Sequence, residues 1–383
     1  MIILNKPYVS EFLIETIRKN GFEVLDNEVA REYFAPEELI KTRDAIDLYE
    51  NKNALFYTNS ENSIDWISEN LKDTKLNMMI TLCKDKSLFR KGIKSIFPNY
   101  YFEEFTKAQL KKVNPSSLKY PLVLKLNTGF LSFGVYPIRT EKEWKKTVEK
   151  LEEDIKKFKG IFPSSVVNTS KFLVEEMIDG KEYAVDAYFD DNSLATVLNI
   201  FEHPFSSGGD VSDRIYYTSK PIIKKYLPKI QEMLNRIGTV CGFTNFPFHL
   251  ELRITGDGRA IPIEINPMRF CGWCITDIAY HAWGINVYEY FLHQQKPDWE
   301  KILSKKDDDY VYFTMADIPS EVNRKEIKSV NYNKYLKNIS NPLDVRKVDY
   351  KNNPVFGIIF GKTHEKKEID NILKLDMKEF IKV

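Results

Sequence analysis

Two glutamates, Glu251 and Glu264, stand on either side of a turn in a stretch where polar and apolar residues alternate. Asp257 and Gly258 between the two alternating runs are typical of a two-residue hairpin turn. That loop places the glutamates opposite each other, with Asn266 on the same face. Facing carboxylates repel unless a cation lies between them. Two carboxylates and an amide oxygen suit Mg²⁺, whereas a solvated hairpin face is the alternative.

The same alternation assigns the neighbours of these residues to the two faces of the hairpin. His249 and Arg253 share the face of the glutamates, and we expect Arg253 to orient the carboxylates. For His249, a core position and a role in the site both stay open. The other face is expected to be apolar and to carry Leu250, Leu252, Ile263 and Ile265.

A candidate anion site follows the predicted strand 120–125. Lys125 ends that strand, and the loop after it, up to Gly134, contains two glycines and two hydroxyl residues. Backbone amides in such loops can form an anion nest, to which the lysine adds a positive charge. A solvated lysine is the alternative. The stretch is not a Walker sequence, and the chain has no protein-kinase motifs.

The stretch 175–182 has the pattern E-E-x-x-x-G-x-E. Together with Lys86, Lys125, the following loop and the glutamate hairpin, in this order, it resembles the ATP-grasp superfamily over about residues 85–292. The small α/β unit in front looks like the one that precedes the grasp in carboxylate–amine ligases.

The resemblance implies a nucleotide site. Lys86 and Lys125 would contact the ATP phosphates, and the loop carrying Ser132 and Gly134 would close over them. The adenine edge would be held by Glu175 and by the backbone of Glu176 and Ile178, and the ribose hydroxyls by Glu182. The metal, one or two Mg²⁺ ions or Mn²⁺ in their place, would be bound by Glu251, Glu264 and Asn266.

The chain departs from the family pattern in two places. The glycine loop contains three bulky residues, Phe130, Leu131 and Phe133. The arginine that usually comes two residues after the metal-binding asparagine is Met268 here, and Arg269 follows it. We therefore expect Arg269 to reach the transferred phosphoryl or the substrate carboxylate through a shifted turn. Arg214 is a further candidate for binding the carboxylate, with a surface arginine as the alternative.

Periodicity predicts the elements that position these residues. Alternating strands and helices predict an α/β fold with a small parallel N-terminal domain (1–84) and a C-terminal α/β segment (305–383). Between them, the resemblance implies a two-lobed ATP-grasp module (85–170 and 171–304). Within this fold we expect a strand at 78–82, a helix at 141–158, a linker at 160–170, a polar loop at 202–215 and a helix at 276–291.

Composition narrows the class of protein. The 383 residues include 56 basic and 55 acidic side chains, which gives no support for nucleic-acid or membrane-surface partners. No apolar run is long enough to span a membrane. Four cysteines suit a reducing cytoplasm. Cys271 and Cys274 have redox or zinc spacing, but no second pair accompanies them.

The resemblance implies an ATP-dependent carboxylate–amine ligase. It would form an acyl phosphate, release ADP and phosphate, and join a small-molecule acid to an amine; a homodimer is compatible with this activity. A phosphotransferase on the same fold and a nucleotide-binding regulatory protein are the alternatives.

Overall fold

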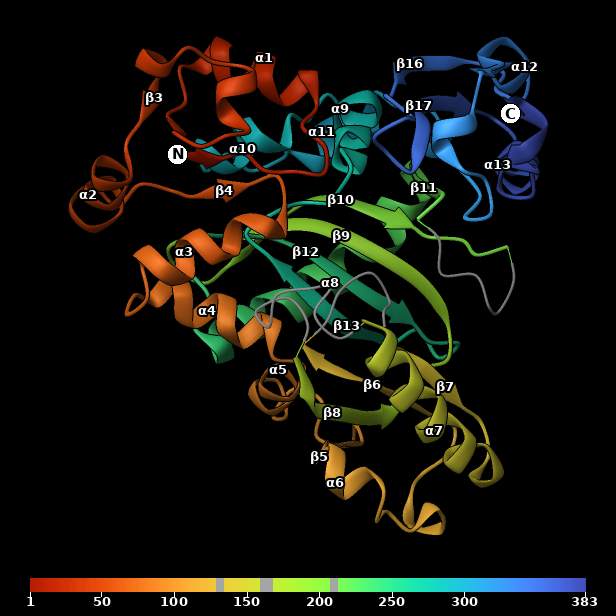
Figure 1. Cartoon of the computed structure of the whole chain (residues 1–383). Helices are drawn as coiled ribbons and strands as arrows, with labels where there is room; N and C mark the ends of the chain where they lie inside the picture. Colours follow the sequence, from red (N-terminus) through yellow and green to blue (C-terminus); the bar gives the residue numbers. More distant parts are fainter. Residues whose placement is uncertain (129–133, 159–167, 207–212) are drawn as a thin grey trace.

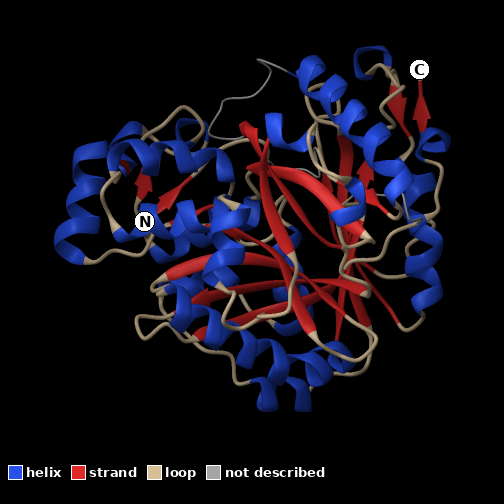
Figure 2. Cartoon of the chain, turned by 90° about the horizontal axis from the view of Figure 1, so that it is seen from below, coloured by secondary structure: helices blue, strands red, loops and turns tan. Residues whose placement is uncertain are grey.

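The computed structural model describes residues 1–128, 134–158, 168–206 and 213–383. Figure 1 shows an N-terminal unit at the upper left, a large central sheet that continues toward the C-terminus at the upper right, and a small lobe below. In Figure 2 the strands gather at the centre of the molecule and helices lie outside them. The mixed α/β architecture confirms the predicted fold class.

The N-terminal unit has a four-stranded parallel sheet of order β3-β2-β1-β4, as alternating strands and helices predict. Helix α1 starts after Ser10, whose hydroxyl accepts from Leu13 N, and it ends at Gly21 in the left-handed conformation. The elements are β1 (Ile2–Ile3), α1 (Glu11–Asn20), β2 (Val24–Leu25), β3 (Leu39–Ile40), α2 (Thr42–Lys52), β4 (Tyr57–Thr58) and α3 (Ile64–Asn70).

The strand expected at 78–82 is wrong, because these residues belong to helix α4 (Lys75–Lys84). Thr74 caps this helix, and its buried side chains recur at helical spacing while Met78 is exposed. A short apolar run does not by itself distinguish a strand from a buried helix. Helix α5 (Lys86–Gly92) follows at once, and the side chain of Asp85 caps it by accepting from Leu88 N.

The small lobe is an antiparallel sheet of order β5-β8-β6-β7. Helix α7 (Glu141–Phe158) has the predicted bounds, and buried side chains from it pack on β6 and β8. Most of the linker expected at 160–170 lies outside the described residues. The other elements are β5 (Phe102–Thr106), α6 (Lys107–Leu110), β6 (Leu122–Thr128), β7 (Tyr136–Ile138) and β8 (Asn168–Glu176).

The large sheet is antiparallel, with the order β13-β12-β9-β10-β11-β14-β17-β16. The boundary expected at 304/305 therefore falls within one continuous sheet. Its strands are β9 (Lys181–Phe189), β10 (Ala195–Glu202), β11 (Ile215–Ser219), β12 (Phe246–Ile254), β13 (Ala260–Pro267), β14 (Tyr310–Asp317), β16 (Pro342–Lys347) and β17 (Val355–Thr363).

Helix α8 (Lys220–Cys241) covers one side of this sheet and contacts β10. The helix expected at 276–291 is two helices, α9 (Ile278–Trp283) and α10 (Val287–Leu292), because Gly284 ends the first one with a positive φ. The remaining elements are α11 (Trp299–Ser304), β15 (Ser329–Val330), α12 (Tyr332–Leu336), α13 (Lys366–Leu373) and β18 (Ile381–Lys382). Among the described residues, no helix combines the length and apolar character needed to cross a membrane.

Candidate active site

The expected pairing of Glu251 with Glu264 is present in β12 and β13, but the turn that joins these strands differs. Thr255 N donates to Arg259 O (3.0 Å), and Gly258 N donates to Thr255 O (2.8 Å). The loop therefore has three residues, and the predicted two-residue turn is wrong. That turn needs two residues with positive φ, whereas only Gly258 supplies one here.

A bulge in β13 restores the expected register. Ile263 is the extra residue between the glutamate pair and the pair formed by Leu252 and Pro262. The expectation that Ile263 lies on the buried apolar face is wrong, because it is half-buried and packs near Ile178 in a separate apolar cluster. The other residues expected on that face are buried: Leu250, Leu252 and Ile265.

The two glutamates have unequal surroundings. Glu264 Oε2 forms an ion pair with Lys86 Nζ (2.7 Å). Glu251 Oε1 accepts a hydrogen bond from Asn266 Nδ2 (3.0 Å). Burial and the charge of Glu264 raise the pKa of Glu251 well above its usual range. Burial acts in the same direction on Glu264, but Lys86 and Lys125 outweigh it and lower the pKa of that carboxyl. A divalent cation would allow both carboxylates to ionise, so the donor set fits Mg²⁺.

Lys125 and Glu175 form a buried ion pair beside this site. Strand β6 continues to Thr128, so Lys125 lies within the strand and not at its end as predicted. Glu175, expected at the adenine edge, also binds Arg90 Nε (2.8 Å). Burial alone would raise the pKa of Glu175, but the two cations hold it at about 2.

Arg90, on α5, joins three elements. Beyond Glu175 on β8, it donates through Nη1 to Pro262 O (2.7 Å) and through Nη2 to Ile263 O (3.2 Å), both at the β13 bulge. Its guanidinium also lies 4.3 Å from the ring centroid of Tyr100. Arg90 therefore ties the small lobe to the strand that carries Glu264.

In the segment between the lobes, where the adenine edge is expected, most backbone groups of Glu176 and Ile178 already have partners within the protein. Glu176 N donates to Tyr101 O (3.0 Å). Ile178 O accepts from Arg253 Nη1 (2.9 Å), while Ile178 N has no acceptor among the described residues. Gly180 turns the chain with φ 135°, and a Cβ there would lie 2.2 Å from Ile254 O. Only glycine allows this close approach of the two backbones.

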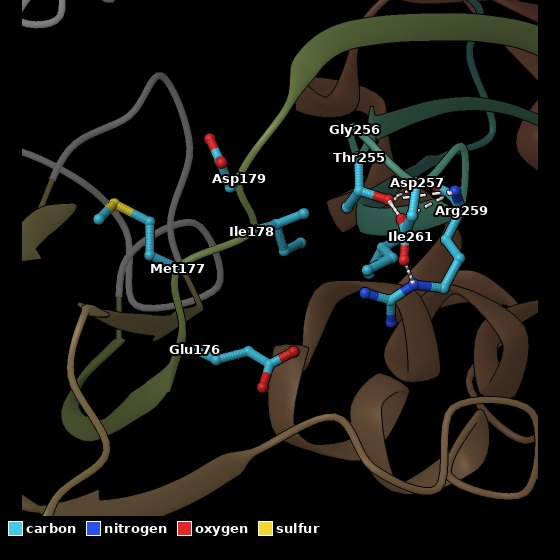
Figure 3. Close-up of a pocket in the computed structure, with 9 residues that line it drawn as sticks. All are labelled: Glu176, Met177, Ile178, Asp179, Thr255, Gly256, Asp257, Arg259 and Ile261. Carbon is cyan, nitrogen blue, oxygen red and sulfur yellow. Dashed lines mark hydrogen bonds and ion pairs between the residues drawn. The ribbon is translucent and has the colours of Figure 1, made fainter.

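A cavity of about 330 Å³ lies between this segment and the β12–β13 turn. In Figure 3 the side chains of Glu176 and Ile178 point toward the turn, and those of Met177 and Asp179 point away from it. Ile178 and Ile261 form part of one small apolar cluster. The lining residues are Glu176, Met177, Ile178, Asp179, Thr255, Gly256, Asp257, Arg259 and Ile261.

Glu182 lies beyond the cavity on β9, opposite Arg253 on β12. Its Oε2 accepts from Arg253 Nη2 (3.1 Å), and its Oε1 lies 3.4 Å from His203 Nδ1. Arg253 also donates to the carbonyl of Ile178. The expectation that Arg253 orients the paired glutamates is wrong, because the carboxylate that it binds is Glu182.

Arg269 comes after Met268, whose φ of 68° provides the turn expected after Asn266. Its guanidinium binds Glu61 of the N-terminal unit, with Nη2 at 2.6 Å and Nε at 3.0 Å from Oε1. The other oxygen of Glu61 binds Lys84 (2.5 Å). Burial would raise the pKa of Glu61, but the two cations hold it at about 2.

Arg214 binds elsewhere in the molecule. Its Nε and Nη2 donate to Asp317 (2.8 and 3.1 Å), and its Nη1 donates to the carbonyls of Leu373 and Leu375, each at 3.1 Å. These contacts attach the end of α13 to β14 and leave Arg214 away from the paired glutamates. They favour a structural role over binding of a substrate carboxylate.

The two lysines expected at the phosphates are carried by linked elements. Asn127, two residues after Lys125, accepts from Ser87 N, next to Lys86 (2.8 Å). Ser132 lies outside the described residues, as do Phe130, Leu131 and Phe133. Gly134 has φ 72°, and a Cβ there would lie 2.9 Å from Leu126 Cγ, so the end of this loop requires glycine.

His249 is buried and pairs with Asp186 (2.8 Å), which also accepts from Cys271 N (2.8 Å).

Cys271 and Cys274 are free, and burial raises the pKa of both thiols well above the usual range. Within the described residues, no three His, Cys, Asp or Glu side chains form a metal cluster. Neutral buried thiols are poor nucleophiles and poor metal ligands.

Three residues of this region were not anticipated from the sequence: Arg90, Glu61 and Lys84. Each lies in a segment without a motif, and each has a partner at least 23 positions away along the chain. The only local signal was the position of Arg90 and Lys84 on helices next to Lys86. Their roles depend on contacts that sequence periodicity does not encode.

Comparison with known proteins agrees with this geometry. The ATP-grasp domain family matches residues 118–277, which include β6, β8, β9, β12 and β13. No curated protein matches the sequence.

Solved structures match almost the whole chain at low sequence identity. An L-amino acid ligase from Bacillus licheniformis has a TM-score of 0.69 at 18% identity, covering 100% of this chain and 97% of that one. An N5-carboxyaminoimidazole ribonucleotide synthetase from Thermotoga maritima has a TM-score of 0.64 at 14% identity (100% and 98% covered). Biotin carboxylase from Campylobacter jejuni has a TM-score of 0.64 at 13% identity (97% and 89% covered). The chain therefore shares its overall fold with these three proteins.

Proposed function

We propose that this chain, whose residues 118–277 form an ATP-grasp domain, is an ATP-dependent carboxylate–amine ligase acting through an acyl phosphate. The observation that carries the proposal is the facing pair Glu251 and Glu264 with Asn266 on the same face, next to Lys86 and Lys125 from the other lobe. This arrangement combines acidic metal ligands with cations for the phosphates, which is what phosphoryl transfer needs.

Each group has a defined task in this proposal. Lys86 and Lys125 bind phosphate oxygens of ATP, the backbone of Glu176 and Ile178 binds the adenine edge, and Glu182 binds the ribose hydroxyls. Mg²⁺ on Glu251, Glu264 and Asn266 would neutralise charge on the β- and γ-phosphates. Arg269 contacts the transferred phosphoryl or the substrate carboxylate.

The reaction transfers the γ-phosphoryl to a carboxylate oxygen. The bond from the γ-phosphorus to the bridging oxygen breaks, ADP leaves with that oxygen, and the acyl phosphate forms. The nitrogen of a neutral amine then attacks the acyl carbon, and the bond from that carbon to the phosphate oxygen breaks. Phosphate leaves with that oxygen, and the amide remains after the nitrogen has lost one proton. One ATP therefore yields ADP and phosphate for each amide.

A screen of carboxylate–amine pairs, measured by phosphate release and product mass, tests the proposal. Phosphate release that requires both an acid and an amine supports the ligase. Release of ADP with a phosphorylated product and no amine dependence would indicate a phosphotransferase. Nucleotide binding without turnover for any pair would indicate a regulatory protein, and stoichiometric AMP would reject the acyl-phosphate route.

The location and the assembly are also proposals. Four free cysteines in 383 residues suit a reducing, cytoplasmic location. The proposed partners are a small-molecule acid and amine, and a homodimer stays a prediction that sedimentation would test.

A further inference from the structure

A carboxylate of the N-terminal unit, Glu61, contacts Arg269 of the candidate active site. Glu61 lies just after β4, at the start of a short turn, and its side chain is 18% exposed. It contacts two cations, Lys84 at the end of α4 and Arg269 beyond β13. Arg269 is separated from Glu61 by 208 positions, so this contact exists only in the folded protein.

The contact occupies one edge of the guanidinium. Nε and Nη2 of Arg269 both donate to Oε1 of Glu61, and Nη1 donates to Phe270 O (3.1 Å). A guanidinium has five N–H groups, and these bonds use three of them. The two that remain, one on each terminal nitrogen, have no acceptor among the described residues. With one N–H left on each terminal nitrogen, the guanidinium can still donate to two oxygens of a phosphoryl or carboxylate group.

The backbone that carries Arg269 is fixed independently of Glu61. Met268 O accepts from Thr58 N (2.8 Å), and Met268 N donates to Pro247 O (2.9 Å). On the other side, Cys271 N donates to Asp186 (2.8 Å). Removal of the Glu61 charge therefore releases the guanidinium without releasing the loop.

We propose that Glu61 is a positioning residue, by which the N-terminal unit holds Arg269 with its free fork directed to the reacting group. This inference rests on the proposed function for the identity of that group. Glu61 itself contacts no substrate. Its effect passes through Arg269, because the guanidinium would otherwise sample several rotamers and satisfy the fork only part of the time.

The simplest alternative is that Glu61 only docks the N-terminal unit onto the large sheet. A matched ion pair separates the two explanations. Glu289 on α10 binds Lys19 and Asn20 of the N-terminal unit, each at 2.9 Å, and its side chain is 20% exposed. It joins the same two parts of the molecule, yet none of its contacts involves a residue of the site.

The test compares Glu61→Gln with Glu289→Gln, once a substrate pair is known. Glu61→Gln should lower kcat on the order of tenfold to 10²-fold and leave the KM for ATP within about twofold, as a misplaced catalytic group does. Glu289→Gln should leave kcat within about twofold. An equal loss in both variants, or none in Glu61→Gln, would overturn the proposal.

A double-mutant cycle tests whether Glu61 acts through Arg269. Once Arg269→Lys has removed the fork, adding Glu61→Gln should lower kcat by no more than about twofold further, because coupled residues are not additive. If the fold-losses in kcat of the two single variants multiply in the double variant, Glu61 does not act through Arg269. Glu61→Asp keeps the charge on a shorter side chain and should recover part of the lost rate.

A binding measurement separates this proposal from the proposed function. Calorimetry with Mg²⁺ and ADP, with and without aluminium fluoride as a mimic of the transferred phosphoryl group, needs no substrate pair. Glu61→Gln should reduce the gain in ADP affinity that aluminium fluoride gives and leave the affinity for ADP alone unchanged, and Glu289→Gln should change neither. An unchanged gain in Glu61→Gln rejects the role of Glu61, whereas failure of every acid–amine pair in the wild-type protein rejects the ligase only.

Discussion

The two ends of the candidate nucleotide site are built in different ways. At the phosphate end, charged side chains already neutralise one another: Lys86 binds Glu264, Lys125 binds Glu175, and Lys84 and Arg269 share Glu61. At the nucleoside end, the main features are backbone groups of Glu176 and Ile178, a cavity of about 330 Å³ and the carboxylate of Glu182, which Arg253 orients.

This difference indicates how each end would bind its part of ATP. When ATP binds at the phosphate end, the lysines must leave their carboxylate partners and bind phosphate oxygens instead. The carboxylates released in this way must bind the metal. A change of one charge there alters several partners at once. At the nucleoside end the shape exists before the ligand arrives, so a substitution should change affinity more than rate.

The largest expected effect is that of Glu264→Gln at the phosphate end. The change removes a metal-ligand charge and the partner of Lys86, so turnover should fall at least on the order of 10³-fold. Steady-state phosphate release at saturating Mg²⁺ measures it, with thermal unfolding to show that the protein stays folded. Glu202→Gln is the control, because that carboxylate also binds two lysines, Lys181 and Lys366, each at 3.2 Å. Near-native activity of Glu264→Gln would show that the metal site is not at this end of the nucleotide site.

Arg269→Lys should lower kcat on the order of 10²-fold with little change in ATP affinity. Lysine keeps the charge but cannot offer a planar fork to two oxygens. The measurement is kcat together with ATP affinity in the same variant. A loss of ATP affinity without a loss of kcat would show that Arg269 binds the ATP ground state. The phosphate end would then respond to substitution in the same way as the nucleoside end.

Arg90→Lys tests the residue that lies between the two ends. The lysine keeps a charge beside Glu175 but loses the bonds to Pro262 O and Ile263 O. Chemical denaturation should show a loss of about 2 kcal/mol in the free energy of unfolding. Arg31→Lys, at a pair with Asp26 in which the Arg31 side chain is 58% exposed, is the control and should leave the free energy of unfolding nearly unchanged. Equal changes in both variants would mean that Arg90 does not hold the lobes together.

The smallest effect is expected at the nucleoside end. Glu182→Ala should weaken ATP binding about tenfold, since a carboxylate that accepts from the ribose hydroxyls contributes a charged hydrogen bond. Binding of dATP should weaken much less because it lacks one hydroxyl. Calorimetric titration with both nucleotides gives the two ratios. Equal losses of affinity for ATP and dATP would show that the ribose contact is made by a residue other than Glu182.

Much of the fold followed from local patterns in the sequence. The end of α1 at Gly21, the start of a helix at Asp85 and the bounds of α7 depend on neighbouring residues alone. The alternation that placed Glu251 and Glu264 on one face is equally local. These features could be predicted because hydrogen bonds within one turn or one strand determine them.

The errors arose where local patterns were ambiguous. Residues 78–82 fit a strand and a buried helix equally well, and only packing on the rest of the molecule selects α4. The prediction for the hairpin missed two features whose effects on the register cancel. The loop is one residue longer than predicted, and the bulge at Ile263 shifts the register back by one residue. The carbonyls at this bulge accept from Arg90, a partner from another part of the chain.

The sequence by itself determined which residues could bind phosphates and metal, and the order in which they occur. The tertiary structure decided which charges meet: Arg90 with Glu175, Arg269 with Glu61, and Arg214 with Asp317 instead of the site. The physical reason is distance along the chain. A side-chain contact between residues 85 or more positions apart depends on how whole elements pack, and no short-range period records that packing.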